Sequence, residues 1–551
     1  MRRDNTGNPT FFRRLRVDRA GNTLALMAAM MLPMVAMAGS AVDTARLYVV
    51  KVRLQQACDA GALAGRKFMV ADDSPVLDAN AAAQASTFFK NNFKAGWMKT
   101  TNVSFTPSKT ADNQVYGTAQ ATVPMALMGM FGMGPSTLTV TCQARFDTAD
   151  TDVIFVLDTT GSMACGPSDP DSCGQATVSY TRPDGTTGYY VQEKSNSRIS
   201  ALRAAVLSFY DTVASSMDPS SKVRYGFVPY TSTVNVGAAI TAIDPGYMVK
   251  SWTYDSRRMT SSGRTPQWRN EAVTLDVSQF VAGASVPDPT KTNGAKSKWQ
   301  GCIEERDTVV APSFDPNNLP PDLDPDLKPW NDATRWRPMW PEVLYWRGSN
   351  NSVSTNGDSS TYFQFADPNL AYLKGGYMVC GKAAQRLQVM ARADVSAYVN
   401  SPDFRPWGGT YHDTGMIWGT RLISPTGIFA ADTAAWPGRQ DPRRFIVFMT
   451  DGHMATNDMI YGMYGWETYD KRTTGGNGQG DAYHDARFLA ECQAAKNRNI
   501  TVFVVSLAAS LDASLSACAS PGQAYFASDS AALTAAFQTI AKQVAMLRLS
   551  Q

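Results

Sequence analysis

Histidine is scarce in this sequence, and charge of either sign is nearly balanced. Only three histidines, His412, His453 and His484, occur among 551 residues, and they are scattered. A zinc site built from histidine and cysteine is therefore disfavoured. The formal net charge is only +3, so nothing indicates a nucleic-acid partner. The sequence also lacks a GxxxxGK[ST] phosphate loop and a GxSxG nucleophile motif, which argues against nucleotide hydrolases and serine esterases.

Cysteine is sparse but even in number, with eight residues in all. Cys165 and Cys173 flank a short loop rich in proline and aspartate, a spacing that favours a local disulfide and hence an oxidising compartment. Two further pairings are considered, Cys302 with Cys380 and Cys492 with Cys518. An exported protein with a few disulfide-closed loops is the interpretation we favour, with the connectivity left open.

The N-terminal region predicts a membrane anchor. An uncharged apolar stretch at residues 24–42 follows an arginine-rich head, and its roughly 19 residues can just span a bilayer as a helix. The positive head would remain in the cytoplasm, with the bulk of the chain outside. A cleaved signal peptide is the alternative, because residues 36–38 (AMA) fit an A-x-A cleavage site. We favour an anchor, because residues 44–66 continue with apolar residues at helical spacing.

A basic head, Gly-Asn before the apolar span, Val-Asp at its end and the run LQQACDAGALA occur together within residues 15–66. In this combination the segment resembles the N-terminal region of TadG-like proteins of the Flp (Tad) pilus-assembly family. It implies a single-pass protein of the bacterial inner membrane, with its bulk in the periplasm or cell exterior and with pilus-assembly components as partners. Leu26 stands five positions after Gly21 where a prepilin cleavage site has Glu, so processing by a prepilin peptidase is not expected.

The length of the chain indicates several domains or one with large insertions. We expect a cytoplasmic head at 1–20, an anchor and continuing helix at 21–66, a small α+β module at 67–148 and an α/β domain at 149–551. The last would carry insertions at about 165–197 and 245–400. Within the small module the pattern predicts a helix at 78–96 and strands at 103–105, 115–123 and 138–146. The Met-rich segment 125–133 between two of these strands is expected to pack in the core, with a membrane-surface or partner-contact loop as the alternative.

The stretch that organises the rest is 152–163, DVIFVLDTTGSM. Its uninterrupted apolar run predicts a strand buried on both faces, as in a parallel sheet. Asp158, Thr160 and Ser162 then lie at the carboxyl end of that strand, where open α/β sheets bind ligands. One carboxylate and two hydroxyls on a tight loop suit Mg²⁺, Mn²⁺ or Ca²⁺.

The segments that follow alternate between helix and strand. The patterns predict helices at 198–214, 483–497 and 530–547 and strands at 223–230, 444–450 and 501–507. A further helix is expected within 408–424, after a loop that begins at Thr410. This alternation is typical of a doubly wound, mostly parallel, Rossmann-like sheet. Two further segments carry oxygen ligands of the same kind: Gly408-Gly409-Thr410 opens a helix, and RFIVFMTD ends at Asp451.

The three segments together resemble the von Willebrand factor A (vWA) family, whose metal-ion-dependent adhesion site begins Asp-x-Ser-x-Ser. Here Thr160 keeps the hydroxyl where that family more often has Ser. The resemblance implies a vWA fold and a divalent ion, Mg²⁺ or else Mn²⁺ or Ca²⁺. Its ligand set would be Asp158, Thr160, Ser162, Thr410 and Asp451, the last commonly through a water. An acidic side chain from a protein partner would complete the metal shell.

Several alternatives remain open at this stage. Asp413 is expected either to cap its helix or to contact the metal, and His453 is expected at the rim rather than in catalysis. The tryptophans of 245–375 could form a carbohydrate platform or, preferably, a small core of their own. The acidic run PPDLDPDL is expected to be a solvated turn rather than a calcium loop. For the whole protein we predict a non-enzymatic adhesion or assembly role; a scaffold with a vestigial site and a metal-dependent hydrolase are the competing hypotheses.

Overall fold

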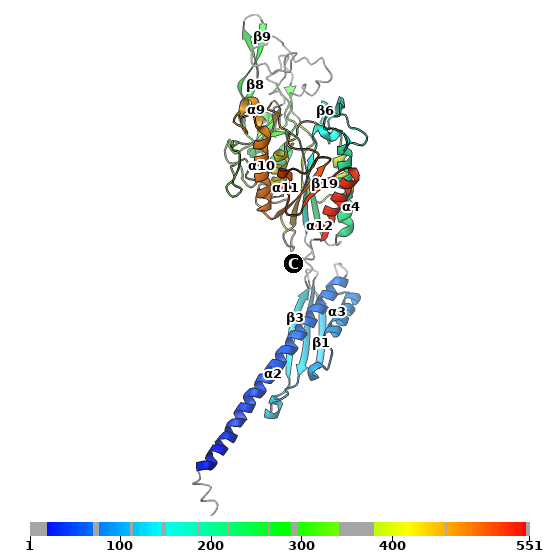
Figure 1. The fold of residues 1–551 in the computed structure, drawn as a ribbon, viewed down its shortest axis with the longest axis vertical. Coiled ribbons are helices and arrows are strands. Elements are labelled where there is room, and N and C mark those ends of the chain that lie inside the picture. Colours follow the sequence, from blue (N-terminus) through cyan, green and yellow to red (C-terminus); the bar gives the residue numbers. More distant parts are fainter. Residues whose placement is uncertain are drawn as a thin grey trace, which may run out of the picture. The chain divides into compact units, whose positions relative to one another are not determined.

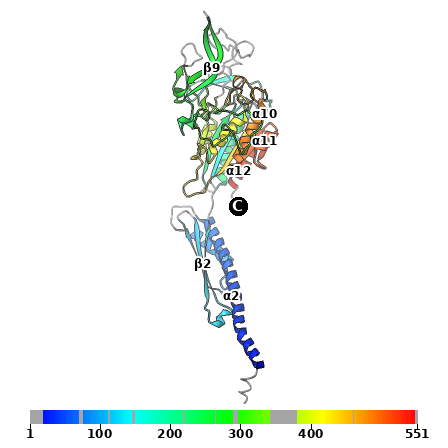
Figure 2. The ribbon, with the colours of Figure 1, turned by 90° about the vertical axis from the view of Figure 1, so that its left-hand side faces the viewer.

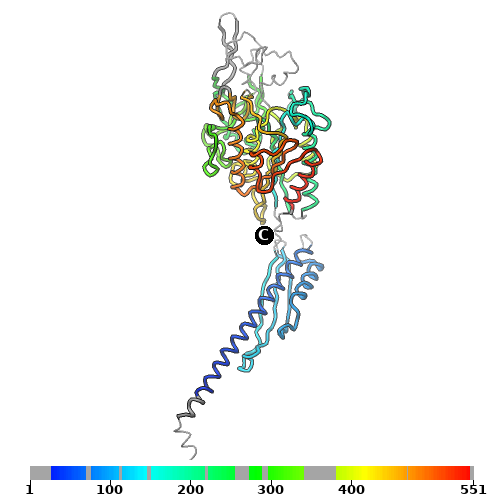
Figure 3. Tube along the Cα trace, in the orientation of Figure 1, coloured from blue at the N-terminus to red at the C-terminus, as the bar shows by residue number. Residues whose placement is uncertain are grey.

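The computed structural model describes residues 19–69, 76–110, 114–144, 150–185, 187–217, 221–262, 265–287, 296–340, 380–458 and 460–546. The chain divides into two compact units, Met1–Asp147 and Thr148–Gln551 (Figure 1, Figure 3). Most of the basic head, residues 1–18, lies outside the described residues.

One long helix dominates the first unit. Helix α2 (Arg19–Phe68) is 50 residues long and continues through Pro33. It is the one described helix that is long and apolar enough to cross a membrane, judged by length and composition. Most side chains of residues 26–42 in its N-terminal half are exposed, whereas Val50, Leu54 and Ala57 farther along are fully buried. Apart from Gly39, which is buried beside Leu127, the apolar half is thus largely uncovered within the unit, and the second half forms part of a core.

A small sheet and a second helix complete this unit. Strands β1 (Thr101–Lys109), β2 (Val115–Val123) and β3 (Ser136–Ala144) form an antiparallel sheet in that order. Figure 2 shows α2 running alongside β2. Helix α3 (Ala79–Asn92), capped by Asp78, also packs on α2, and short 3-10 turns occur at η1 (Trp97–Lys99) and η2 (Met128–Phe131). The predicted strands are confirmed, and so is the predicted helix except that it ends at Asn92 rather than 96; the end of the last predicted strand, 145–146, lies outside the described residues.

The second unit is an α/β domain with a six-stranded mixed sheet. Its strand order is β14-β7-β4-β15-β18-β19. The strands are β4 (Thr151–Asp158), β7 (Val223–Tyr230), β14 (Gln385–Gln388), β15 (Arg443–Thr450), β18 (Ile500–Leu507) and β19 (Ala524–Ala527). All neighbours are parallel except β14, which runs antiparallel to β7 at the edge. Every residue of β4 is buried, as its continuous apolar run predicts.

Helices cover both faces of this sheet. Helices α4 (Arg198–Ser216), α7 (Arg392–Val399) and α12 (Ser530–Met546) pack on the face that carries Phe155 of β4. Helices α8 (His412–Ile423), α10 (Gly480–Lys496) and α11 (Ala513–Cys518) pack on the face that carries Val156. Side chains that alternate along one strand thus contribute to two separate cores. The predicted α/β class is confirmed.

Two insertions interrupt the alternation. The first holds η3 (Gly161–Ala164) and the hairpin of β5 (Thr177–Thr181) and β6 (Thr187–Val191). The second carries short elements and one longer hairpin: α5 (Gly237–Thr241), η4 (Pro245–Tyr247), β8 (Ser251–Ser262), β9 (Thr265–Asp276), α6 (Ser278–Val281), β10 (Val286–Pro287), β11 (Lys296–Ser297), β12 (Ile303–Glu304) and β13 (Arg337–Pro338). Between β15 and α10 lie three more short elements, β16 (Tyr461–Gly462), β17 (Gly465–Trp466) and α9 (Glu467–Asp470). Neither the edge strand β14 nor α7 was predicted; both fall inside the insertion expected at about 245–400.

The second insertion has its own interior. Trp340 is buried in a small separate core, as expected, whereas Trp336 packs into the main core of the sheet against Trp418 and Trp330 is exposed. The acidic run is not a solvated turn, and that expectation is wrong. Asp322 is buried against Arg487, and Asp326 pairs with Arg498, because basic side chains of α10 and the segment after it meet this run.

The cysteines form four disulfides. The pairs Cys165–Cys173, Cys302–Cys380 and Cys492–Cys518 confirm the pairings considered from the sequence. The fourth, Cys58–Cys142, joins α2 to β3 and was not predicted. Disulfides therefore occur in both units.

Candidate metal centre

The candidate site begins where β4 ends. Asp158 is fully buried, and its carboxylate accepts two hydrogen bonds, one on each oxygen. Oδ1 accepts from the backbone N–H of Thr160 at 2.8 Å, and Oδ2 accepts from the hydroxyl of Thr450 at 2.8 Å. Because β4 and β15 are adjacent parallel strands, their last residues meet at one edge of the sheet.

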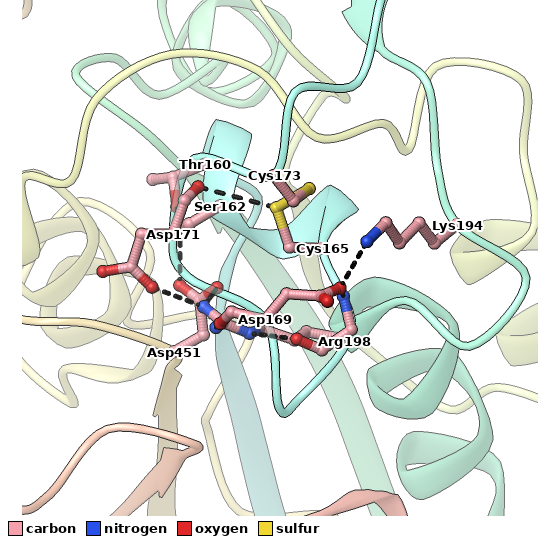
Figure 4. The surroundings of a disulfide bond; sticks show 10 residues. Thr160, Ser162, Cys165, Asp169, Asp171, Cys173, Lys194, Arg198 and Asp451 are labelled. Carbon is pink, nitrogen blue, oxygen red and sulfur yellow. Dashed lines mark hydrogen bonds and ion pairs between the residues drawn. A yellow bond between two sulfur atoms is a disulfide. The ribbon is translucent and has the colours of Figure 1, made fainter.

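A chain of short side-chain contacts continues from this loop to the end of β15. The hydroxyls of Thr160 and Ser162 lie 3.0 Å apart, and Ser162 donates to Asp451 Oδ1 at 2.9 Å. Arg198 donates to the other oxygen, Asp451 Oδ2, at 2.9 Å. The structure thus brings four of the five predicted ligand residues into one hydrogen-bonded set. Figure 4 shows three of them, Thr160, Ser162 and Asp451.

Arg198 also ties the set to the disulfide-closed loop. Its guanidinium donates to the carboxylate of Asp171 at 2.8 Å and to the carbonyl of Asp169 at 2.7 Å. The Cys165–Cys173 disulfide closes the loop that presents these two residues (Figure 4). The short predicted loop therefore positions the arginine that faces Asp451.

The loop that carries Thr410 is joined to the site by backbone hydrogen bonds of its preceding residues. The N–H of Gly161 donates to the carbonyl of Gly408 at 3.0 Å, and the N–H of Trp407 donates to the carbonyl of Thr159 at 2.8 Å. The loop that carries Thr410 is thereby fastened to the loop that carries Thr160 and Ser162. The Thr410 hydroxyl, although nearly buried, takes no part in the described hydrogen bonds of the set.

Burial disfavours the charged forms of the two carboxyl groups of the site. Burial raises the pKa of Asp158, against the opposing effect of its hydrogen bonds from Thr160 and Thr450. Burial, and then the charge of Asp158, raise the pKa of Asp451 to about 7, although Arg198 and Ser162 oppose the shift. Two carboxylates in a dry environment destabilise each other, and a cation near them would relieve that repulsion.

The donor set determines which ions it fits. Among the described residues no group of three or more histidine, cysteine, aspartate or glutamate side chains could hold a metal ion. The predicted set contains only two carboxylates; the others are hydroxyls of Thr160, Ser162 and Thr410. Neutral and anionic oxygens of this kind fit a hard divalent ion such as Mg²⁺ and do not fit zinc.

Three residues around the site were not predicted from the sequence to act there. Thr450 bridges to Asp158, and His412 Nε2 lies 3.1 Å from the same Thr450 hydroxyl. A Thr450 hydroxyl that donates to Asp158 can accept from His412 Nε2, and burial, which lowers the pKa of His412 to about 4, favours a neutral ring. Thr450 directly precedes Asp451, and Arg198 is the first residue of α4. Their contacts with the site depend on the order of the strands, which the sequence alone does not give.

Two other singled-out residues have different roles. Asp413 neither caps α8 nor joins the set, because its carboxylate accepts from His484 Nδ1 at 2.7 Å in a buried pair. His453 is an exposed rim residue, as expected, with Nδ1 2.9 Å from the carboxylate of Asp512.

A groove opens beside the candidate site. Its volume is about 450 Å³, and its walls combine apolar side chains with the glycines of the two site loops. The lining residues are Gly161, Thr177, Val191, Trp407, Gly408, Gly409, Ala455, Thr456, Asn457 and Ile460. The groove and the candidate site therefore share the loops at 161 and at 408–409.

Comparison with known proteins defines the N-terminal segment. Residues 21–85 match the family described as "Putative Flp pilus-assembly TadE/G-like". The predicted resemblance of this segment is confirmed, and the match supports a pilus-associated protein. No curated protein matches the sequence.

Three solved structures share a weak overall similarity with the chain. The PilB minor pilin of Streptococcus sanguinis, in the form of a single-residue mutant, has a TM-score of 0.29 and 11% identity, with 81% of this chain and 78% of that chain covered. The vWF domain of the type V pili tip protein Mfa5 from Porphyromonas gingivalis has a TM-score of 0.28 and 10% identity, with coverage of 73% and 98%. The pilus adhesin SpaC of Lactobacillus rhamnosus GG has a TM-score of 0.28 and 13% identity, with coverage of 80% and 34%. Similarity of this size carries no argument; the fold and the candidate site rest on strand order and side-chain geometry.

Proposed function

We propose that the chain is a membrane-anchored, non-enzymatic protein of a Tad/Flp-type pilus system. Its C-terminal unit would be a vWA-type domain that binds a protein partner through a divalent metal ion. One observation carries the proposal: the hydrogen-bonded set that joins Asp158, Thr160 and Ser162 to Asp451 across two adjacent strand ends. This arrangement gathers hard oxygen donors from segments almost 300 residues apart, at the edge of the sheet where α/β domains bind ligands.

Each residue would have a distinct role in holding the ion. Asp158 would supply the anionic oxygen, and Ser162, Thr160 and Thr410 would supply neutral hydroxyl oxygens. Asp451 would act through a water, because Arg198 and Ser162 already occupy its two oxygens. When bound, Mg²⁺ would supply an electrophilic centre that retains exchangeable waters.

The charge balance of the set favours an acidic partner. Asp158 and Asp451 bring two negative charges, and Arg198, which is buried beside Asp451, offsets one of them. A divalent ion would therefore keep a net positive charge, and a partner carboxylate could replace one of its waters. The neighbouring groove would receive the apolar residues that flank this carboxylate, against Trp407, Val191 and Ile460.

The proposed location follows from the first unit. Helix α2 would cross the bacterial inner membrane once, with the arginine-rich head in the cytoplasm. Four disulfides, present in both units, support an oxidising location for everything after the span, in the periplasm or cell exterior.

The Asp158→Asn variant tests the metal-centred role. Asn keeps the shape of the side chain but removes its charge, so we expect a folded, exported protein that no longer binds Mg²⁺. In wild type, Mg²⁺ at 100 times its dissociation constant should add about 2.7 kcal/mol of stability, and the variant should gain almost none. Titration calorimetry, thermal unfolding with and without Mg²⁺, and counts of pili on complemented cells provide the measurements.

His453→Ala is the matched control, because His453 is exposed at the rim of the site and its ion pair is with Asp512, which is not one of the proposed ligands. It should bind Mg²⁺ and support piliation as wild type does. If wild-type protein shows the same unfolding temperature with Mg²⁺ as with chelator, the site is vestigial and the scaffold hypothesis holds instead.

A further inference from the structure

The segment between β2 and β3 exposes an unusual amount of apolar surface. Residues 124–135 read PMALMGMFGMGP and contain no charged or hydrophilic side chain; we call this segment the apolar loop. Met130 is 74% exposed, Met133 54% and Phe131 42%. The expectation that this segment packs into the core is therefore wrong for these residues. Contiguous exposed apolar surface of this kind marks an interaction site.

Asp43 of α2 holds the apolar loop on the helix. The carboxylate of Asp43 accepts hydrogen bonds from the backbone N–H groups of Ala126 at 2.9 Å, Leu127 at 3.0 Å and Met128 at 2.7 Å. Asp43 is itself buried beneath the loop. Three charge-assisted bonds to one carboxylate hold the loop in a set position on the helix.

That position lies beside the end of the apolar span. Asp43 is the first charged residue after the uncharged stretch 24–42, and Gly39 precedes it by about one turn, or about 6 Å along the helix axis. A Cβ atom on Gly39 would lie 3.1 Å from Leu127 Cβ, so the loop touches the helix inside the span itself. A side chain at position 39 would push the loop away.

The surroundings of the loop have the composition of a membrane interface. Arg46, one turn beyond Asp43, donates to the carbonyls of Pro124 and Met98. Met98 is exposed, and it lies between Trp97 and the exposed Lys99. Tryptophan, lysine and arginine gather at the level of lipid headgroups in membrane proteins.

We propose that the apolar loop inserts into the extracytoplasmic leaflet of the bilayer beside the span of α2. The inference rests on the proposed membrane anchoring, because any surface level with Gly39 faces lipid once the span is in place. Met130, Phe131 and Met133 enter the acyl region to a depth of roughly 5–10 Å, as interfacial segments do. Two points of attachment then fix the tilt and rotation of the first unit on the membrane.

Depth-dependent quenching tests this inference on the full-length protein. All eight cysteines are disulfide-bonded, so a cysteine introduced at an exposed site can be labelled selectively with an environment-sensitive fluorophore. The variants are Met130→Cys in the apolar loop, Met34→Cys in the span and Ser108→Cys, which is exposed at the opposite end of the same sheet. Each is reconstituted in phosphatidylethanolamine and phosphatidylglycerol vesicles that contain lipids brominated at defined depths.

We expect quenching at Met130 and Met34 and none at Ser108. The label at Met130 should respond most to bromines near the headgroup end of the acyl chain, and that at Met34 to deeper bromines. If Met34 is quenched but Met130 responds no more than Ser108, the loop inference is overturned while the anchor stands. Shielding of Met130 from aqueous iodide without lipid quenching would show that protein covers the loop and would also overturn it. No quenching at Met34 would remove the anchor, and the inference with it.

Discussion

Arg198 offsets the charge of two neighbouring buried carboxylates, those of Asp158 and Asp451, at the end of the sheet. It is 2% exposed and bonds Asp451 on one side and Asp171 on the other. A buried carboxylate without such a partner is strongly destabilising, because its hydration is lost without replacement. The arginine thus sets both the stability of the apo site and the charge it offers a metal.

Replacing Arg198 by leucine should cost about 3–5 kcal/mol of unfolding free energy, since it leaves the buried Asp451 without its cation. Mg²⁺ should recover part of this loss, because the ion supplies positive charge at the same place. Denaturant unfolding with Mg²⁺ and with chelator measures both effects.

Arg392→Leu is the matched control for that experiment. Arg392 pairs with Asp211, but both side chains are about half exposed, so the loss should be at most about 1 kcal/mol and should not respond to Mg²⁺. Equal losses of unfolding free energy in the two variants would show that the buried Arg198–Asp451 pair stabilises the protein no more than the exposed pair does.

His412 gives the domain a defined response to acid. Burial lowers the pKa of His412 to about 4, against smaller opposing effects of Asp512 and Asp413, whereas an unfolded histidine titrates near 6.5. Between these values the unfolded chain binds the proton and the folded chain does not. The contribution of neutral His412 is therefore complete above pH 6.5 and is lost as pH falls, by about 2 kcal/mol at pH 5.

The His412→Gln variant isolates this effect, because Gln can still donate to Thr450 but does not titrate. In chelator, the stability of wild type relative to the variant should fall between pH 7.5 and pH 5. Parallel pH profiles for the two proteins would contradict a buried neutral histidine.

The sequence predicts the site residues only where they are local to a strand end. Asp158 and Asp451 each close an apolar run, so their positions follow from the pattern alone. Arg198, Thr450 and His412 meet them through strand order and helix packing, which no local pattern contains. Asp413 was misassigned for the same reason: its partner His484 is 71 positions away on another helix.

At the scale of elements, prediction succeeded where a segment is buried on two faces. Strands β4, β15 and β18 are apolar throughout because helices cover both sides, and each was expected within a residue or two of its bounds. Strand β14, with the sequence QRLQ, lies at the edge and buries only Leu387. A short polar edge strand leaves no periodic signal, so its antiparallel pairing required the structure.

The apolar loop offers a prediction at this scale. Asp43→Ala removes the acceptor of three backbone N–H groups, so amide exchange at Ala126, Leu127 and Met128 should become much faster in detergent-solubilised protein. Asp59→Ala is the control, because Asp59 is exposed and accepts only from Gln55, one turn away on the same helix. Unchanged protection in Asp43→Ala would mean that side-chain packing alone fixes the loop.

At the scale of the whole molecule, two of the four disulfides close loops of very different length. Cys58–Cys142 spans 84 residues, whereas Cys165–Cys173 spans 8. In the chain-entropy model these closures contribute about 4.5 and about 2.5 kcal/mol. The long pairing escaped prediction because nothing local links a helix residue to a strand residue so distant in sequence.

Paired serine substitutions test this difference. Cys58→Ser with Cys142→Ser should lower the unfolding temperature of the first unit and leave the second unchanged. Cys165→Ser with Cys173→Ser should act on the second unit, with the smaller loss, and should weaken Mg²⁺ binding because the loop that bonds Arg198 is freed. Calorimetry that resolves two transitions provides the measurement, and a single shared shift in both variants would contradict independent units.

The Cys58–Cys142 bond has a mechanical consequence. A pull on the C-terminal unit travels down the backbone from β4 into β3 and reaches Cys142 near the end of that strand. There the covalent bridge passes the tension straight to Cys58 on the helix, so residues 59–141 are relieved of it. An external force on this protein would thus cross from the small sheet to the long helix through a covalent bridge, and the part of the sheet between the two cysteines would lie outside its path.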